Sequence, residues 1–204
     1  VVSEDLLSFE LGYRIAPNER WAIDSSIFYN IYDDLSSTDL PTGLTGPNPA
    51  LPIGLPYSTL VATSANDSEG DIYGGELTID YAPREWLRLT GAYSFAEISL
   101  DADPDTEGSY PEQMAWARAR VNPIDTVDLD LIVRFMDQLP SLVDIDNYVT
   151  MDVRIAWRPR EDLELALAGR NLLEDENLEF RSSTILIDDT EVERSVYGQV
   201  TWKF

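Results

Sequence analysis

The sequence Arg194-Ser-Val-Tyr-Gly-Gln-Val-Thr-Trp-Lys-Phe204 decides how the rest of the chain is interpreted. Apolar residues or glycine occupy every second position, from Val196 through Val200 and Trp202 to Phe204. Polar residues and one tyrosine fill the positions between them. A period of two with one apolar side and one polar side predicts an amphipathic β-strand.

Eight earlier segments alternate in the same way, so we expect nine strands and almost no helix. In one of them Leu7, Phe9 and Leu11 alternate with Ser8 and Glu10. The predicted strands cover residues 6–15, 21–31, 72–81, 87–95, 113–121, 127–135, 149–157, 163–169 and 194–204.

The predicted connections between these strands are alternately short and long. Three short ones share a signature, because Pro17, Pro83 and Pro159 are each followed two residues later by glutamate. Clusters of Pro, Gly, Ser and Asp predict loops in the long connections. Loops as long as the first of these are usually functional or disordered. The long connections cover roughly residues 33–68, 101–108, 138–147 and 172–190.

Aromatic residues gather at both ends of the predicted strands. Tyr and Trp suit the interface of a membrane, where one edge of the ring is apolar and the other is wet. We expect an interfacial girdle near the short connections, made of Tyr13, Trp21, Tyr81, Trp86, Trp157 and Trp202. A second set lies toward the long connections and comprises Tyr29, Tyr32, Tyr73, Tyr93, Phe95, Phe135 and Tyr148.

The composition excludes several classes of protein. The 204 residues contain no Cys and no His, which rules out disulfide scaffolds, Ser-His-Asp and Cys-His triads, and zinc sites built on Cys or His. The 38 acids and 14 bases give a net charge of −24, and no cluster of bases suits nucleic acid. There is no run of roughly 18 apolar residues for a membrane helix and no signal peptide at Val1. We therefore expect an intracellular chain, a processed chain or a fragment.

The whole pattern favours an all-β, antiparallel up-and-down transmembrane β-barrel, present here as a partial barrel of about nine strands. Strands of about ten residues, short turns at one end, long loops at the other and two aromatic bands are typical of this fold. The charged side of each strand would line an aqueous lumen. A soluble β-sandwich or propeller also alternates, although each recurrence of about 40 residues here holds two strands and not the four of a blade.

Four stretches resemble the C-terminal end of TonB-dependent outer-membrane receptors. These are Tyr148–Trp157, Leu163–Asp175, Glu179-Phe180 and Glu193–Phe204. Within the second, Gly169-Arg170-Asn171-Leu172-Leu173 is similar to the penultimate-strand motif of that family. Near the start of the chain, Ser-Phe-Glu-Leu-Gly-Tyr-Arg at residues 8–14 looks like a strand from the middle of the barrel.

The resemblance implies that residues 1–204 are the C-terminal portion of a receptor β-barrel in the bacterial outer membrane. The plug domain and the N-terminal strands of the roughly 22-stranded barrel would be absent. Implied partners are that missing barrel half and plug, outer-membrane lipid, the outer-membrane assembly machinery, TonB through the plug, and a small-molecule ligand. No nucleic acid is expected.

The resemblance also implies a function. Such a receptor takes up a scarce nutrient, such as a ferric siderophore or cobalamin, with energy supplied through TonB, and it is not an enzyme. Two alternatives stay open: a passive porin-like outer-membrane barrel and a soluble β-rich binding module. With Phe204 in the periplasm, the short turns would be periplasmic and the long loops would lie outside the cell.

Few residues suggest a specific site. Phe204, Trp202 and Val200 resemble the signal that the assembly machinery recognises, although they would also suit a girdle. Asp101, Asp103, Asp105 and Glu112 have the spacing of a calcium loop. Thr106 stands where that loop needs glycine, Pro104 stiffens its middle and no helices flank it, so a solvated acidic loop is the alternative. We assign no catalytic residue and expect no cofactor other than this calcium.

Overall fold

The structure is a computed structural model that describes residues 2–39, 63–101, 108–139, 145–174, 176–180 and 190–204. The regular structure of these residues is β-strand throughout, with no helix among them that is long and apolar enough to cross a membrane. The strands are β1 (Asp5–Asn18), β2 (Trp21–Asp39), β3 (Thr63–Arg84), β4 (Leu87–Leu100), β5 (Gln113–Ile124), β6 (Val127–Met136), β7 (Tyr148–Arg160), β8 (Leu163–Arg170), β9 (Glu176–Phe180), β10 (Thr190–Glu193) and β11 (Ser195–Trp202).

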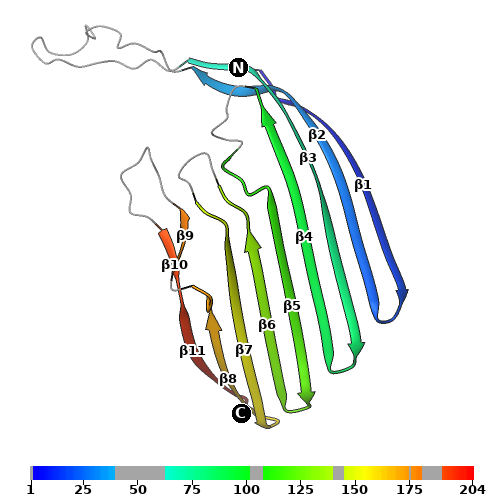
Figure 1. Cartoon of the computed structure of the whole chain (residues 1–204), viewed down its shortest axis with the longest axis vertical. Coiled ribbons are helices and arrows are strands. Elements are labelled where there is room, and N and C mark those ends of the chain that lie inside the picture. Colours follow the sequence, from blue (N-terminus) through cyan, green and yellow to red (C-terminus); the bar gives the residue numbers. More distant parts are fainter. Residues whose placement is uncertain (1, 40–62, 102–107, 140–144, 175, 181–189) are drawn as a thin grey trace, which may run out of the picture.

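Nine of the strands form one antiparallel sheet in the order β1-β2-β3-β4-β5-β6-β7-β8-β11. Sequence neighbours are also spatial neighbours, apart from the step from β8 to β11, and β1 and β11 are the two edges. The sheet is curved, and its short turns are gathered at one end (Figure 1). This confirms the predicted up-and-down wall of nine strands.

The register keeps the alternation of the sequence continuous across the whole sheet. One row of directly opposed residues runs through Ile23, Ile79, Gly91, Ala117, Val133 and Met151. Between the bulges, the apolar face is formed by the odd-numbered residues of β1 to β8 and the even-numbered residues of β11; the charged face is formed by the others. A slip of one residue in any pair would exchange the two faces, so the apolar pattern fixes the register.

The prolines of the four short hairpins lie in bulges and not in the turns, where we expected three of them. Ala16 and Pro17 together oppose the single residue Ala22, and pairing resumes at Asn18 and Trp21. Proline tolerates a bulge because it has no N–H to give to a ladder. The same two-against-one arrangement occurs at Pro83, Pro123 and Pro159.

A repeated hydrogen bond joins each short hairpin to the next strand. The residue before the proline of the next hairpin donates its N–H to the carbonyl of the second turn residue. The bonds are Ala82 to Arg20 at 2.8 Å, Asn122 to Trp86 at 2.8 Å and Arg158 to Thr126 at 2.7 Å. In β11 the same bond runs from Lys203 to Asp162 at 2.8 Å, so Phe204 stands where the other strands have proline.

Two predicted loops contain strands. β2 continues to Asp39 and β3 begins at Thr63, although residues 33–68 were predicted to be a loop. This upper part pairs across a bulge near Asp34, whose φ is 56°, and Asn66 donates to the Asp34 carbonyl at 2.7 Å. Between Arg20 and Arg84, which includes this upper part, the chain has no Lys or Arg. Likewise β9 and β10 form a two-stranded sheet that begins inside the predicted loop 172–190.

The described residues form no interior core. Only Ile145, Ala156 and Ala168 are buried among their hydrophobic side chains, and large apolar residues of β1 and β11 are exposed. Because hydrophobic burial is the main driving force of folding in water, this single curved layer requires apolar surroundings for one of its faces.

Candidate functional site: the charged face of the sheet

Ionisable side chains lie along the charged face of all nine strands except β11. They come from alternate residues of strands whose other face is apolar, so the strand period alone brings them together. They are Glu10, Arg14, Asp24, Glu76, Asp80, Arg88, Arg118, Arg120, Asp128, Asp130, Arg134, Asp152, Arg154, Arg158, Glu164 and Arg170.

Most of these arginines make ion pairs with a neighbouring strand. Arg88 lies 3.0 Å from Asp80, Arg134 lies 2.8 Å from Asp152, and Arg154 lies 2.6 Å from Glu164. Further pairs join Arg14 to Asp24, Arg118 to Asp130 and Arg158 to Asp128. Half-exposed pairs of this kind contribute only about 0–1 kcal/mol each, so their role is to fix side-chain positions more than to stabilise the sheet.

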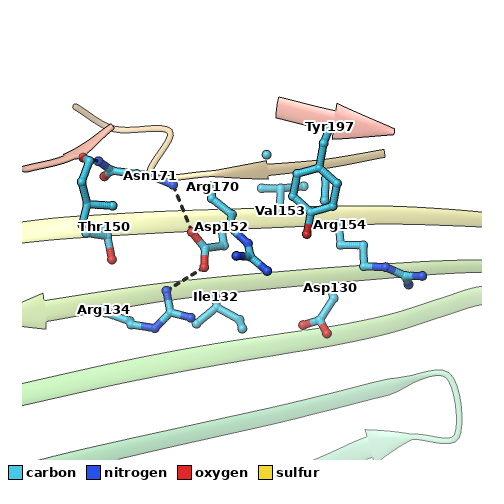
Figure 2. Close-up of a pocket in the computed structure, with 13 residues that line it drawn as sticks. Asp130, Ile132, Arg134, Thr150, Asp152, Val153, Arg154, Arg170, Asn171 and Tyr197 are labelled. Atoms are coloured by element: carbon cyan, nitrogen blue, oxygen red, sulfur yellow. Dashed lines mark hydrogen bonds and ion pairs between the residues drawn. The ribbon is translucent and has the colours of Figure 1, made fainter. Parts of the chain in front are cut away.

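A cavity of about 540 Å³ lies on the charged face over β6, β7, β8 and β11, below the β9–β10 hairpin. Asp152 lies at its centre, accepting from Arg134 and, at 3.1 Å, from the backbone N–H of Asn171 (Figure 2). The Arg170 side chain reaches from β8 across β7 toward Asp152 (Figure 2), and its guanidinium lies 5.5 Å from the centre of the Tyr197 ring.

Asn171 connects this cavity to the β9–β10 hairpin. It is almost fully buried, has a φ of 52°, and donates from Nδ2 to the Val192 carbonyl at 2.7 Å. Asparagine tolerates the left-handed conformation better than most residues. In the sequence, residues 169–173 are distinguished only by their family resemblance. The asparagine of this motif ends β8 and anchors the hairpin, a role that the sequence did not reveal.

The residues predicted for the interfacial girdle lie on or beside the apolar face at the short-turn end. Trp21 and Tyr81 stack with ring centres 3.9 Å apart, and Trp86 lies in the turn between β3 and β4. The girdle itself stays a prediction. In the second aromatic set, which was predicted near the long connections, Tyr32 and Tyr148 differ from the other members, because the register places these two on the charged face. On the apolar face are Tyr13, Trp21, Tyr81, Trp157 and Trp202.

The predicted assembly-signal residues lie at the end of β11. Val200 and Trp202 point to the apolar face, and Phe204 is fully exposed. The Trp202 indole donates to Asp162 at 3.1 Å, and Asp162 also binds Arg160 at 2.8 Å. These contacts tie the last strand to the β7–β8 turn and leave the Phe204 side chain available to a partner.

The calcium prediction cannot be placed as a whole. Asp103 and Asp105 lie outside the described residues, whereas Asp101 and Glu112 lie within them. Among the described residues, no group of three or more carboxylates is arranged to hold a metal ion. The calcium site stays a prediction.

The chain resembles several solved receptor structures. The ferripyoverdine receptor of the Pseudomonas aeruginosa outer membrane aligns with a TM-score of 0.75 and 13% identity, over 98% of this chain and 27% of that one. The ferric-catecholate import receptor Fiu from K12 E. coli aligns with a TM-score of 0.73 and 12% identity, over 98% and 28%. The FrpB iron transporter from Neisseria meningitidis gives 0.66 and 17%, over 98% and 31%. At these identities the likeness shows the fold alone.

The chain therefore spans less than a third of the length of these receptors. No curated protein matches it by sequence. A family model described as the TonB dependent receptor-like β-barrel matches residues 3–172, which is most of the chain. Taken with the two-faced antiparallel wall, this match shows that the chain belongs to the TonB-dependent receptor family, as part of its β-barrel domain.

Proposed function

We propose that this chain is part of the barrel wall of a bacterial outer-membrane receptor that takes up a scarce nutrient, such as a ferric siderophore or cobalamin, with energy supplied through TonB. The observation that supports it most is the separation of a mainly apolar face from a mainly polar face, which the register keeps over nine strands. In a barrel of this family the apolar face meets lipid and the charged face lines the interior. The family consists of transport receptors, and we propose that this protein likewise is not an enzyme.

The length of the similar receptors supports active uptake over a passive pore. They are named a ferripyoverdine receptor, a ferric-catecholate import receptor and an iron transporter, and each is more than three times as long as this chain. We infer that the complete protein includes the remaining barrel strands and a plug that fills the lumen and contacts TonB. In that arrangement the Phe204, Trp202 and Val200 side chains serve recognition by the assembly machinery at the periplasmic side.

The test is an uptake assay with the complete receptor gene in a strain lacking its own siderophore receptors. Radiolabelled iron is supplied as a panel of ferric siderophores, and labelled cobalamin is supplied separately, with and without a working TonB. We expect one ligand to accumulate only when receptor and TonB are both present. Uptake that is equal without TonB would favour the porin-like alternative. A protein recovered in the soluble fraction would favour the soluble binding module.

A further inference from the structure

Acidic and basic side chains are distributed unevenly among the strands of the charged face. On β1 to β3 the charged face has one arginine, Arg14, against four carboxylates; on β4 to β8 it has more arginines than carboxylates. This excess of bases is unexpected in a chain with a net charge of −24. The bases are Arg88, Arg118, Arg120, Arg134, Arg154, Arg158 and Arg170, and the acids on the same strands are Asp128, Asp130, Asp152 and Glu164.

Arg120 has no carboxylate partner among the described residues. The register places it directly between Arg88 and Asp130. Asp130, however, binds the diagonal neighbour Arg118, with Arg118 Nε at 2.7 Å, and Arg88 binds Asp80. Like charges that are directly opposite on neighbouring strands destabilise a sheet. On its other side Arg120 faces Asp130, which offsets this repulsion, but its exposed guanidinium makes no hydrogen bond or ion pair among the described residues and can receive a further acceptor.

Arg170 is the second arginine without a carboxylate partner in the described part of the charged face. Its guanidinium lies over the Tyr197 ring and beside the cavity of about 540 Å³. A ring below the guanidinium plane restrains the side chain and leaves its N–H groups free for an acceptor. Arg134 and Arg154 also line this cavity, together with Asp130 and Asp152, so Arg170 is the one base of the lining that is not in an ion pair among the described residues.

We propose that the wall of β4 to β8 and β11 docks an acidic surface of the plug domain, with Arg120 and Arg170 as positioning residues that each receive a plug carboxylate. This inference rests on the function proposed above. It assigns the plug an orientation inside the barrel: the acidic side of the plug faces β5 to β8, away from the acidic wall of β1 to β3.

The separation of the two arginines favours a folded domain over a small ligand as the occupant. Arg120 is on β5 and Arg170 on β8, three strand spacings apart, which is roughly 14 Å along the sheet. The two arginines also differ in height along the strands. Arg120 lies in the same row as Ala168 of β8, and Arg170 lies two residues beyond Ala168, further from the short turns. One carboxylate of a bound nutrient cannot reach both positions, whereas the surface of a domain that fills the lumen can.

The experiment uses the complete receptor in planar bilayers, with channel opening in rising urea as the measure of plug release. We expect Arg120→Glu and Arg170→Glu to open the pore at lower urea, with at least about tenfold more openings at a fixed concentration. Arg120→Lys keeps the charge and should stay close to wild type. Arg20→Glu is the matched control, because Arg20 is an exposed turn arginine with no ion pair among the described residues.

Salt gives a second reading of the same contact. Raising the salt from ~0.1 M to ~1 M shortens the Debye length about threefold and should lower the urea needed for release in the wild type. The Arg120→Glu receptor should show a weaker salt dependence, because the Arg170 contact remains. Heat-modified mobility on gels shows whether each barrel is folded. If a reversal variant does not assemble, the glutamine variant at the same position, Arg120→Gln or Arg170→Gln, replaces it.

Two results would overturn the proposal. One is pore opening in the reversal variants at the same urea concentration as in wild type. The other is weaker binding of the transported ligand with unchanged plug release, which would make the ligand the occupant. Uptake assays separate this from the proposed function: TonB-dependent uptake with no change in plug release refutes the docking surface alone. A wild-type receptor without TonB-dependent uptake refutes the function, while the urea measurement still decides the docking.

Discussion

Gly74 lies under the ring of Phe28, at a point of the charged face with no room for a side chain. The two residues are directly opposed on β3 and β2. A Cβ atom at position 74 would come within 2.6 Å of Phe28 Cζ and would overlap the carbonyl oxygen of Phe95. An aromatic ring covering a glycine in this way compensates for the apolar surface that the glycine lacks.

We therefore expect Gly74→Ala to destabilise the complete barrel by about 1–3 kcal/mol, as is usual for overpacking. Gly91→Ala is the matched control, because the nearest atom to its Cβ would be the Trp116 carbonyl oxygen at an ordinary 3.6 Å. The measurement is the urea midpoint of barrel unfolding, followed by heat-modified gel mobility. Equal midpoints for the two variants would show that the Phe28 ring can move aside at little cost.

At this scale the sequence predicts which face a side chain occupies but not its partner. Alternation places Arg118, Arg120 and Asp130 on one face. Asp130 is directly opposite Arg120 but binds its diagonal neighbour Arg118, and this contact is defined only by the register of the assembled sheet. The role of Asn171 was hidden for a similar reason, since its acceptor Val192 belongs to a strand that the alternation did not predict.

Among the elements, the β9–β10 hairpin is joined to the end of β8 by a hydrogen bond from Asn171. Asn171 supplies both a left-handed backbone conformation and a hydrogen bond to the Val192 carbonyl. Glycine adopts that conformation freely but lacks the donor, whereas alanine lacks the donor and is also strained. The two substitutions therefore separate the two contributions.

We expect Asn171→Gly to weaken the hairpin by about 0.5–1.5 kcal/mol, the usual net value of one hydrogen bond. Asn171→Ala should add roughly 1–3 kcal/mol of strain. Hydrogen exchange of the β10 amides in the complete receptor measures both, with the β5 amides as an internal reference. If alanine and glycine accelerate exchange equally, the conformation at residue 171 contributes nothing to the anchoring.

The strand ends were the least predictable feature of the elements. β2 and β3 continue beyond the bulge at Asp34 with Ser, Thr, Asn and Asp, which are residues typical of loops. Backbone pairing and side-chain bonds such as Ser37 to Asp67 hold this extension together without an apolar face. The prolines predicted that the strands end before the short turns, but a bulge can hold a proline within a strand, so the strands continue past them.

For the whole molecule, the two-faced wall was predictable because one physical requirement governs every strand. A sheet with one apolar face and one polar face produces the same alternation in every strand, and the four short hairpins repeat one geometry. The β9–β10 hairpin lies outside this rule, which explains why the sequence did not predict it.

We expect the chain to aggregate when it is prepared by itself in buffer without detergent. β1 and β11 are unpaired edges of the sheet, and their apolar side chains, such as Leu11 and Val200, are exposed. Exposed edges and large apolar patches both promote association. Sedimentation velocity at a series of protein concentrations tests this, with a detergent-solubilised sample as the control. A single monomeric species in plain buffer would contradict it.

The absence of Lys and Arg between Arg20 and Arg84 has a practical consequence for proteolysis. Trypsin cleaves only after those two residue types, and both arginines lie at the short-turn end, next to the β1–β2 and β3–β4 turns. Trypsin therefore has no cleavage site within the β2–β3 hairpin before Arg84 at the end of β3, although these two strands are the longest pair of the described sheet. A glutamate- or aspartate-specific protease has several cleavage sites in the same segment and is the appropriate enzyme for mapping its exposure.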